Sequence, residues 1–183
     1  MFSDQRSKKI VLVSHCILNQ NSISDGTADF PGTNASIVKL LMESNVGIIQ
    51  LPCPELFCLG LDRGDVHGCE RDVVVENTRI RHQLESERSA EMIQHLVDQT
   101  LFQINEYIKH GFSILGVIGI NRSPSCGIET TSKNDQEVCG EGVFMERLKL
   151  ELERNGIHLD MIGIKALETD AAIGSIQKMI LKP

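Results

Sequence analysis

Residues 113–127 read Ser-Ile-Leu-Gly-Val-Ile-Gly-Ile-Asn-Arg-Ser-Pro-Ser-Cys-Gly, and this stretch carries the clearest signal of the fold. Its first eight residues form a short apolar run with β-branched side chains, which predicts a buried strand. The next seven residues are rich in turn formers, so the strand is expected to end in a loop. Ligands of parallel sheets bind beyond the carboxyl ends of the strands, which makes this loop a candidate binding segment.

Other strands and helices are predicted outward from this stretch. Apolar runs predict three further strands, at residues 8–14, 46–51 and 158–164. Apolar residues that recur at intervals of three and four predict helices that begin at Thr33 or Asn34, cover residues 90–108 and 142–155, and close the chain at residues 171–181. A long polar loop is expected at residues 19–32 and a short strand within residues 72–80.

The alternation of strand and helix predicts an α/β fold. We expect residues 1–183 to form a single domain with an open, mostly parallel sheet of about four to five strands and helices on both faces, a Rossmann-like architecture. An order of 2-1-3-4 would place the first strand between the second and the third. The carboxyl ends of these three strands would then be neighbours, separated by about 4.8 Å from strand to strand.

Composition narrows the classes of function. The chain is 41% hydrophobic and 23% charged, has a net charge of −7 and a pI of about 5.4, and contains no apolar run long enough to span a bilayer. An acidic protein has no general attraction to a nucleic acid polymer or an anionic membrane. The beginning of the chain lacks the features of a secretory signal. We therefore expect a cytoplasmic protein that interacts with neither.

Three cysteines follow the three neighbouring strands. Cys16, Cys53 and Cys126 each come within a few residues of a predicted strand end, so their thiols are expected at one edge of the sheet. Cytosolic cysteines stay reduced, and cysteines in a chain of this size are metal ligands, catalytic groups or core residues. One such cysteine would be a small buried hydrophobe, but three at adjacent strand ends favour a shared metal or cluster site.

The kind of metal stays open at this point. Three thiolates on zinc would need water or another group as the fourth ligand. Three thiolates on a cubane iron–sulfur cluster would leave one iron free to bind substrate. The sequence has no Cys-x-x-Cys spacing, so it predicts neither a zinc ribbon nor a ferredoxin-type site. Glu55, two residues after Cys53, is either an acid or base beside the metal or a solvated side chain.

The motifs around these cysteines resemble those of a known family. The segments that carry the likeness are Val-Ser-His-Cys at 13–16, Cys-Pro-Glu at 53–55 with Gly60-Leu61 and Arg63 after it, and Ser-Pro-Ser-Cys-Gly at 123–127. Together they are similar to the thiouracil desulfurase family, known as DUF523. The loops after Cys16 and Cys53 differ from the family pattern, so the chain resembles a divergent relative. The resemblance implies a [4Fe–4S] cluster on Cys16, Cys53 and Cys126, with Glu55 as acid or base and Ser123 positioning substrate or protons.

The function expected on these grounds is that of an enzyme, a [4Fe–4S]-dependent desulfurase. It would remove sulfur from a small thiolated compound by hydrolytic chemistry without net redox change. Two alternatives keep the thiol site, namely a zinc-thiolate hydrolase and a non-catalytic module that binds metal or sulfide. The sequence does not choose between a monomer and a homodimer, and it assigns no role to Cys58, Cys69 or Cys139.

Overall fold

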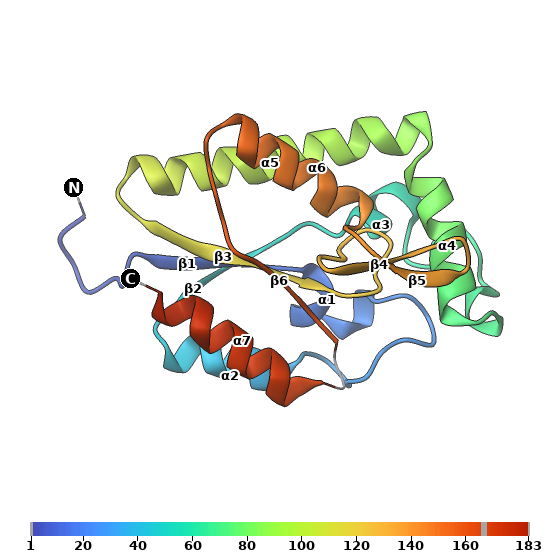
Figure 1. The fold of residues 1–183 in the computed structure, drawn as a ribbon, viewed down its shortest axis with the longest axis horizontal. Helices are drawn as coiled ribbons and strands as arrows, with labels where there is room; N and C mark the ends of the chain where they lie inside the picture. The colour runs from blue at the N-terminus through green and yellow to red at the C-terminus, as the bar shows by residue number, and fades with distance from the viewer. Residues whose placement is uncertain (1, 166–167, 183) are drawn as a thin grey trace.

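A four-stranded parallel sheet forms the centre of the protein, as seen in a computed structural model that describes residues 2–165 and 168–182. The strand order is β2-β1-β3-β6 (Figure 1). The strands are β1 (Lys9–Val13), β2 (Gly47–Gln50), β3 (Ser113–Ile120) and β6 (Met161–Ile164). The prediction of an α/β fold with a parallel sheet is confirmed, and the order found is the 2-1-3-4 order that would make the ends of the first three strands neighbours.

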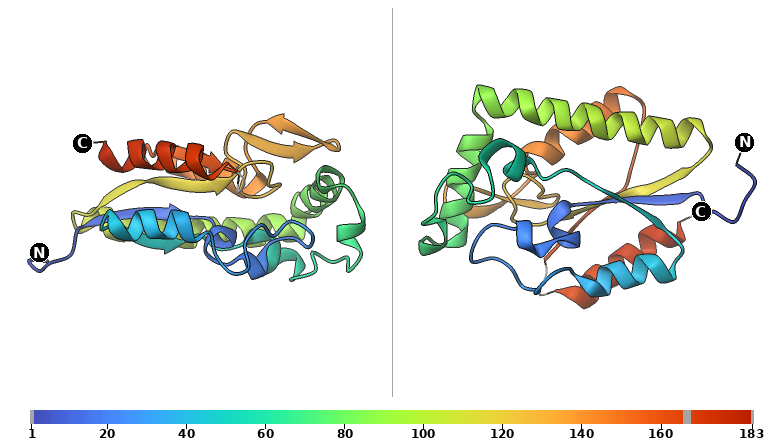
Figure 2. Two further views of the ribbon diagram at one scale, coloured as in Figure 1. Left: turned by 90° about the horizontal axis from the view of Figure 1, so that it is seen from below. Right: turned by 180° about the vertical axis from the view of Figure 1, so that it is seen from behind.

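Helices cover both faces of this sheet (Figures 1 and 2). The helices are α1 (His15–Leu18), α2 (Ala35–Glu43), α3 (Pro54–Leu59), α4 (Val73–Leu84), α5 (Glu87–Lys109), α6 (Val143–Arg154) and α7 (Thr169–Leu181). Helices α5 and α6 lie on one face, and α2 and α7 lie on the other. Helices α1, α3 and α4 gather at the carboxyl ends of the strands.

The alternation of side chains along β1 explains how one short strand serves two cores. Leu12 packs with residues of α5 and α6, whereas Val11 and Val13 pack with residues of α2 and α7. All three side chains are fully buried. A strand that is covered on both faces reads as a continuous apolar run, which is the pattern that the sequence shows at this position.

The prediction of a short strand within residues 72–80 is wrong, because helix α4 begins at Val73, directly after Asp72. The run Val73-Val74-Val75 has high strand propensity, but propensity is readily overridden by tertiary packing. Here Ile80 and Leu84 are fully buried in the core beside α5 and α6. Helix α4 packs against a short antiparallel hairpin of β4 (Thr130–Lys133) and β5 (Gln136–Cys139). The sequence did not predict this hairpin.

The longest helix follows its sequence signals closely. The Ser86 hydroxyl caps α5 by accepting a hydrogen bond from the backbone N–H of Ser89. Gly111, with φ of +77°, follows the end of the helix in the left-handed conformation. Within the described residues, no helix is both long and apolar enough to cross a membrane.

Candidate functional site

Three thiols lie around one cavity at the carboxyl edge of the sheet. Cys16 is in α1 directly after β1, Cys53 precedes α3 after β2, and Cys126 lies in the loop after β3. Each of the three lines the same cavity, whose volume is about 290 Å³. The structure therefore brings to one cavity the three cysteines that the sequence singled out, the first and last of which are 110 residues apart in the chain.

The three thiols influence one another electrostatically. Burial raises the pKa of the Cys53 thiol to about 11, with the neighbouring Glu55 adding to the rise. Burial also raises the pKa of Cys126 to about 12, and here Cys53 contributes. The pKa of Cys16 is raised well above its ordinary value by burial and then by Cys126 and Cys53. Burial and mutual repulsion therefore favour the neutral thiols, and a positively charged group among them would favour the thiolates instead.

Hydrogen-bond donors lie beside the Cys53 sulfur, and a hydroxyl lies near the Cys126 sulfur. Cys53 Sγ accepts from the backbone N–H of Leu56 at 3.5 Å, and Nη2 of Arg63 lies 3.9 Å from the same sulfur. The Ser125 hydroxyl lies 3.5 Å from Cys126 Sγ. Donors directed at sulfur suit thiolates that bind a metal centre, whose properties they adjust.

The Ser14 hydroxyl, in the residue directly after β1, is a further polar group near the Cys126 thiol. Ser14 is fully buried, and its Oγ is the one buried side-chain oxygen or nitrogen among the described residues that lacks a hydrogen-bond partner. It lies near enough to the Cys126 thiol to help lower that group's pKa. A buried hydroxyl without a hydrogen-bond partner costs free energy. The Ser14 hydroxyl would gain a strong acceptor if the Cys126 thiol lost its proton and became a thiolate.

The thiols around the cavity are candidate ligands of a metal centre. In the part of the chain that the structure describes, no three His, Cys, Asp or Glu side chains come close enough together to hold one ion. The three thiols nevertheless line one cavity. A set of three thiols can supply three ligands to a zinc ion or to a cubane iron–sulfur cluster.

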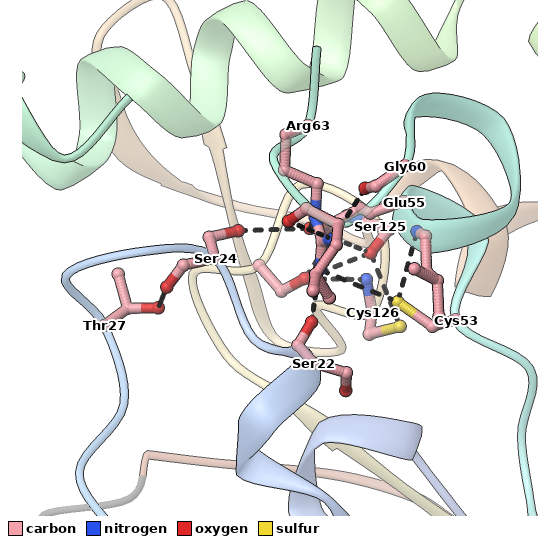
Figure 3. A network of polar contacts seen from close by, with 12 residues as sticks. Ser22, Ser24, Thr27, Cys53, Glu55, Gly60, Arg63, Ser125 and Cys126 are labelled. Carbon is pink, nitrogen blue, oxygen red and sulfur yellow. Dashed lines mark hydrogen bonds and ion pairs between the residues drawn. The ribbon is translucent and has the colours of Figure 1, made fainter. Parts of the chain in front are cut away.

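Glu55 lies at the centre of a buried polar network (Figure 3). Its Oε2 accepts from Arg63 Nε at 2.9 Å and from the Ser24 hydroxyl at 3.2 Å. Its Oε1 accepts from the Ser125 hydroxyl at 2.6 Å. A carboxylate oxygen offers about two acceptor positions, so Oε2 is saturated and Oε1 keeps one position free.

Ser123 connects the cavity to this network. Its Oγ accepts from the backbone N–H groups of Ser125 and Cys126, at 3.3 Å and 3.0 Å, so its own proton remains available for donation. The Ser125 hydroxyl lies 3.3 Å away and already donates to Glu55. The three side chains therefore form a line of hydrogen bonds from Ser123, through Ser125, to Glu55.

Helix α6 holds the loop that carries Ser125 and Cys126. Its first-turn N–H groups donate to loop carbonyls, from Val143 to Pro124 at 2.9 Å and from Phe144 to Ser125 at 3.1 Å. Gly142, just before the helix, packs directly against the peptide that joins Ser125 to Cys126, where a Cβ atom would lie 2.4 Å from the Ser125 carbonyl carbon.

We predict that Gly142→Ala destabilises the protein by about 1–3 kcal/mol, because overpacking against a fixed backbone forces the chain to shift. Urea unfolding of the metal-free protein measures this change. Gly174→Ala in α7 is the matched control, since its added Cβ meets no atom within 4 Å. It should gain about 0.5–1 kcal/mol from helix propensity. Equal effects of the two substitutions would contradict this account of Gly142.

The structure places residues in the site to which the sequence assigned no role. Arg63 and Ser24 are buried partners of Glu55, and sequence analysis gave neither a role in the site. Gly127 admits the close approach of another part of the chain, because a Cβ there would lie 2.2 Å from the Thr130 carbonyl oxygen. The Cys58 thiol points to the Ser89 carbonyl on α5, at 3.8 Å.

The fold and the site together define an α/β protein with a three-thiol cavity at the carboxyl edge of its parallel sheet. Uncharacterized protein MJ0003 of Methanocaldococcus jannaschii is 31% identical over 177 residues, which cover 96% of this chain and 99% of that protein. This chain belongs to the same family as that protein. No model of a protein family matches the sequence.

A solved structure has a more distant likeness to this chain. The [4Fe-4S]-dependent thiouracil desulfidase TudS aligns with 92% of this chain and 99% of its own, at 20% identity and a TM-score of 0.42. A likeness at that level is too remote to assign a function, which must come from the residues of the site.

Proposed function

We propose that this protein is a [4Fe–4S]-dependent desulfidase that hydrolytically removes sulfur from a small thiolated compound. The observation that carries the proposal is the placement of three thiols around one cavity beside a carboxylate with one free acceptor position. Cys16, Cys53 and Cys126 would hold the cluster. When bound, the cluster supplies a Lewis-acidic iron that polarises the bond between carbon and sulfur.

Protons are handled by the protein's own side chains in this proposal. The overall reaction converts a thiocarbonyl and water into a carbonyl and sulfide, with no net change of oxidation state. Glu55 Oε1, which retains a free acceptor position, takes a proton from the water that attacks carbon. The Ser123 hydroxyl faces the cavity and connects it to Oε1 through Ser125.

The dimensions and setting of the cavity favour a small molecule as substrate. At about 290 Å³ it lies near the lower end of the usual range for ligand pockets. The proposal includes a cytoplasmic location, where thiols remain reduced, and no nucleic acid polymer or membrane as partner. The second candidate is a zinc-thiolate hydrolase, in which the same three thiols would hold one zinc ion with water as the fourth ligand.

Anaerobic reconstitution followed by iron and sulfide analysis tests the cofactor. We expect about four iron and four sulfide per chain, the content of a cubane cluster. Incubation with 2-thiouracil and thioacetamide as probes, without reductant, should then release sulfide from at least one thiolated compound. Uptake of about one zinc and no iron would contradict the cluster. A stable cluster without turnover of any thiolated compound would indicate a non-catalytic module instead.

A further inference from the structure

Arg63 is a buried arginine that lies outside the predicted ligand and catalytic set. Its side chain is 3% exposed, and it reaches from the segment after α3 into the centre of the network in Figure 3. Its backbone adopts φ of +56°, a conformation that costs energy for any residue other than glycine. A buried charge on a strained backbone persists only where many contacts hold it in place.

The guanidinium group of Arg63 uses every one of its donors. Nε binds Glu55 at 2.9 Å, and Nη1 donates to the carbonyls of Gly60 and Leu61 at 2.9 and 3.1 Å. Nη2 donates to the carbonyl of Ser22 and lies 3.9 Å from Cys53 Sγ. An arginine side chain has five N–H donors in a fixed planar arrangement, so these five contacts account for all of them.

These contacts join segments that are distant in sequence. Ser22 belongs to the segment 19–32, which lines one wall of the cavity, whereas Glu55 and Cys53 belong to the start of α3. The same segment also contacts Glu55 directly, through the Ser24 hydroxyl. We propose that Arg63 is the positioning residue that clamps segment 19–32 to α3 and directs Glu55 Oε1 into the cavity.

Two charged side chains of α4 support the backbone of Arg63. Arg79 Nη2 donates to the Arg63 carbonyl at 2.9 Å, and Arg79 is itself paired with buried Glu76 at 2.6 Å. These contacts fix the strained backbone from the side of α4. The position of Arg63 is therefore determined from both sides, as a positioning role requires.

This inference rests on the proposed function only for the use of Oε1, because the clamp itself exists without any cofactor. Arg63 occupies Oε2 together with Ser24, which leaves Oε1 as the oxygen that has capacity for chemistry. Lysine keeps the charge but has three donors around one nitrogen. It therefore cannot reach Ser22, Glu55 and the carbonyls of residues 60–61 at the same time.

Amide hydrogen exchange of the metal-free protein tests the clamp. In Arg63→Lys, the amides of residues 20–30 should exchange at least about tenfold faster, as expected for loss of charged hydrogen bonds. The amides of β1 and β3 should exchange as in the wild type. Arg154→Lys is the control, because Arg154 is 62% exposed and its ion pair, with Glu151, lies on α6 away from this network.

A second variant distinguishes the planar group from its charge. Arg63→Gly suits the positive φ and should also speed exchange in residues 20–30. Added methylguanidine should restore slow exchange, whereas methylammonium should not. Wild-type exchange in these variants, or equal rescue by methylammonium, would overturn the clamp. Neither result depends on a cluster, so the failure of this inference and that of the desulfidase proposal are distinguishable.

Discussion

Cys126→Ser is expected to abolish retention of the iron–sulfur cluster, lowering iron from about four per chain to nearly none. Serine is close in size to cysteine but cannot provide a thiolate, so a cluster with three protein ligands would lose a third of its attachment. The same result is expected for Cys16→Ser and Cys53→Ser, because all three thiols line one cavity. Iron, sulfide and the visible spectrum after anaerobic reconstitution measure the loss.

The matched control is Cys58→Ser. The Cys58 thiol is only five residues from Cys53, but it points to the Ser89 carbonyl on α5 and does not line the cavity. This variant should retain the wild-type iron content. Loss of the cluster in Cys58→Ser with retention in Cys53→Ser would show that the ligands have been wrongly assigned.

The position of the three cysteines could be predicted because it depends on strand order alone. In a parallel sheet every strand ends at the same edge, so a cysteine just after each of β1, β2 and β3 must lie near the other two. The order β2-β1-β3 makes these strands neighbours. Local sequence patterns were enough for this step, since each strand is a short apolar run that ends at a polar or proline-containing segment.

The polar network could not be predicted, because its partners are separated by long stretches of sequence. Ser125 and Glu55 are 70 residues apart, and Arg63 contacts Ser22 across 41 residues. Nothing in the local sequence shows whether an arginine in a glycine-containing loop is buried or exposed to solvent. The one local sign was the proximity of Arg63 to the Cys-Pro-Glu motif, which indicates a shared site but not a direction for the side chain.

Helix α4 was misread for a related reason. Its buried face is largely polar, and two of its buried side chains bind distant partners: Asn77 donates to the Arg122 carbonyl, and Arg81 donates to the Thr131 hydroxyl. Periodicity of apolar residues is the main sequence signal for a helix. A helix that buries Asn and Arg against a hairpin lacks this signal, although its packing is as specific as that of an apolar helix.

The second large effect is expected in Glu55→Gln, which should retain the cluster but lower the rate of sulfide release by on the order of 10²–10⁴. Glutamine has the same shape, but only one of its two terminal atoms can accept a hydrogen bond. Arg63 Nε and the Ser24 hydroxyl both donate to Oε2, so the amide oxygen must occupy that position. The NH₂ group then replaces Oε1, where it can neither accept from Ser125 nor take a proton.

Sulfide release from a thiolated probe that the wild type turns over measures this effect, with iron content determined on the same sample. Glu70→Gln serves as the control, because the Glu70 side chain is 71% exposed and contacts only His67 among the ion pairs of the described residues. That variant should retain wild-type rates. If Glu55→Gln released sulfide at the wild-type rate with full iron content, the proton would have to be accepted elsewhere. Ser123 and Ser125 would then be left without a terminal acceptor, and the line of hydrogen bonds that ends at Oε1 would be structural only.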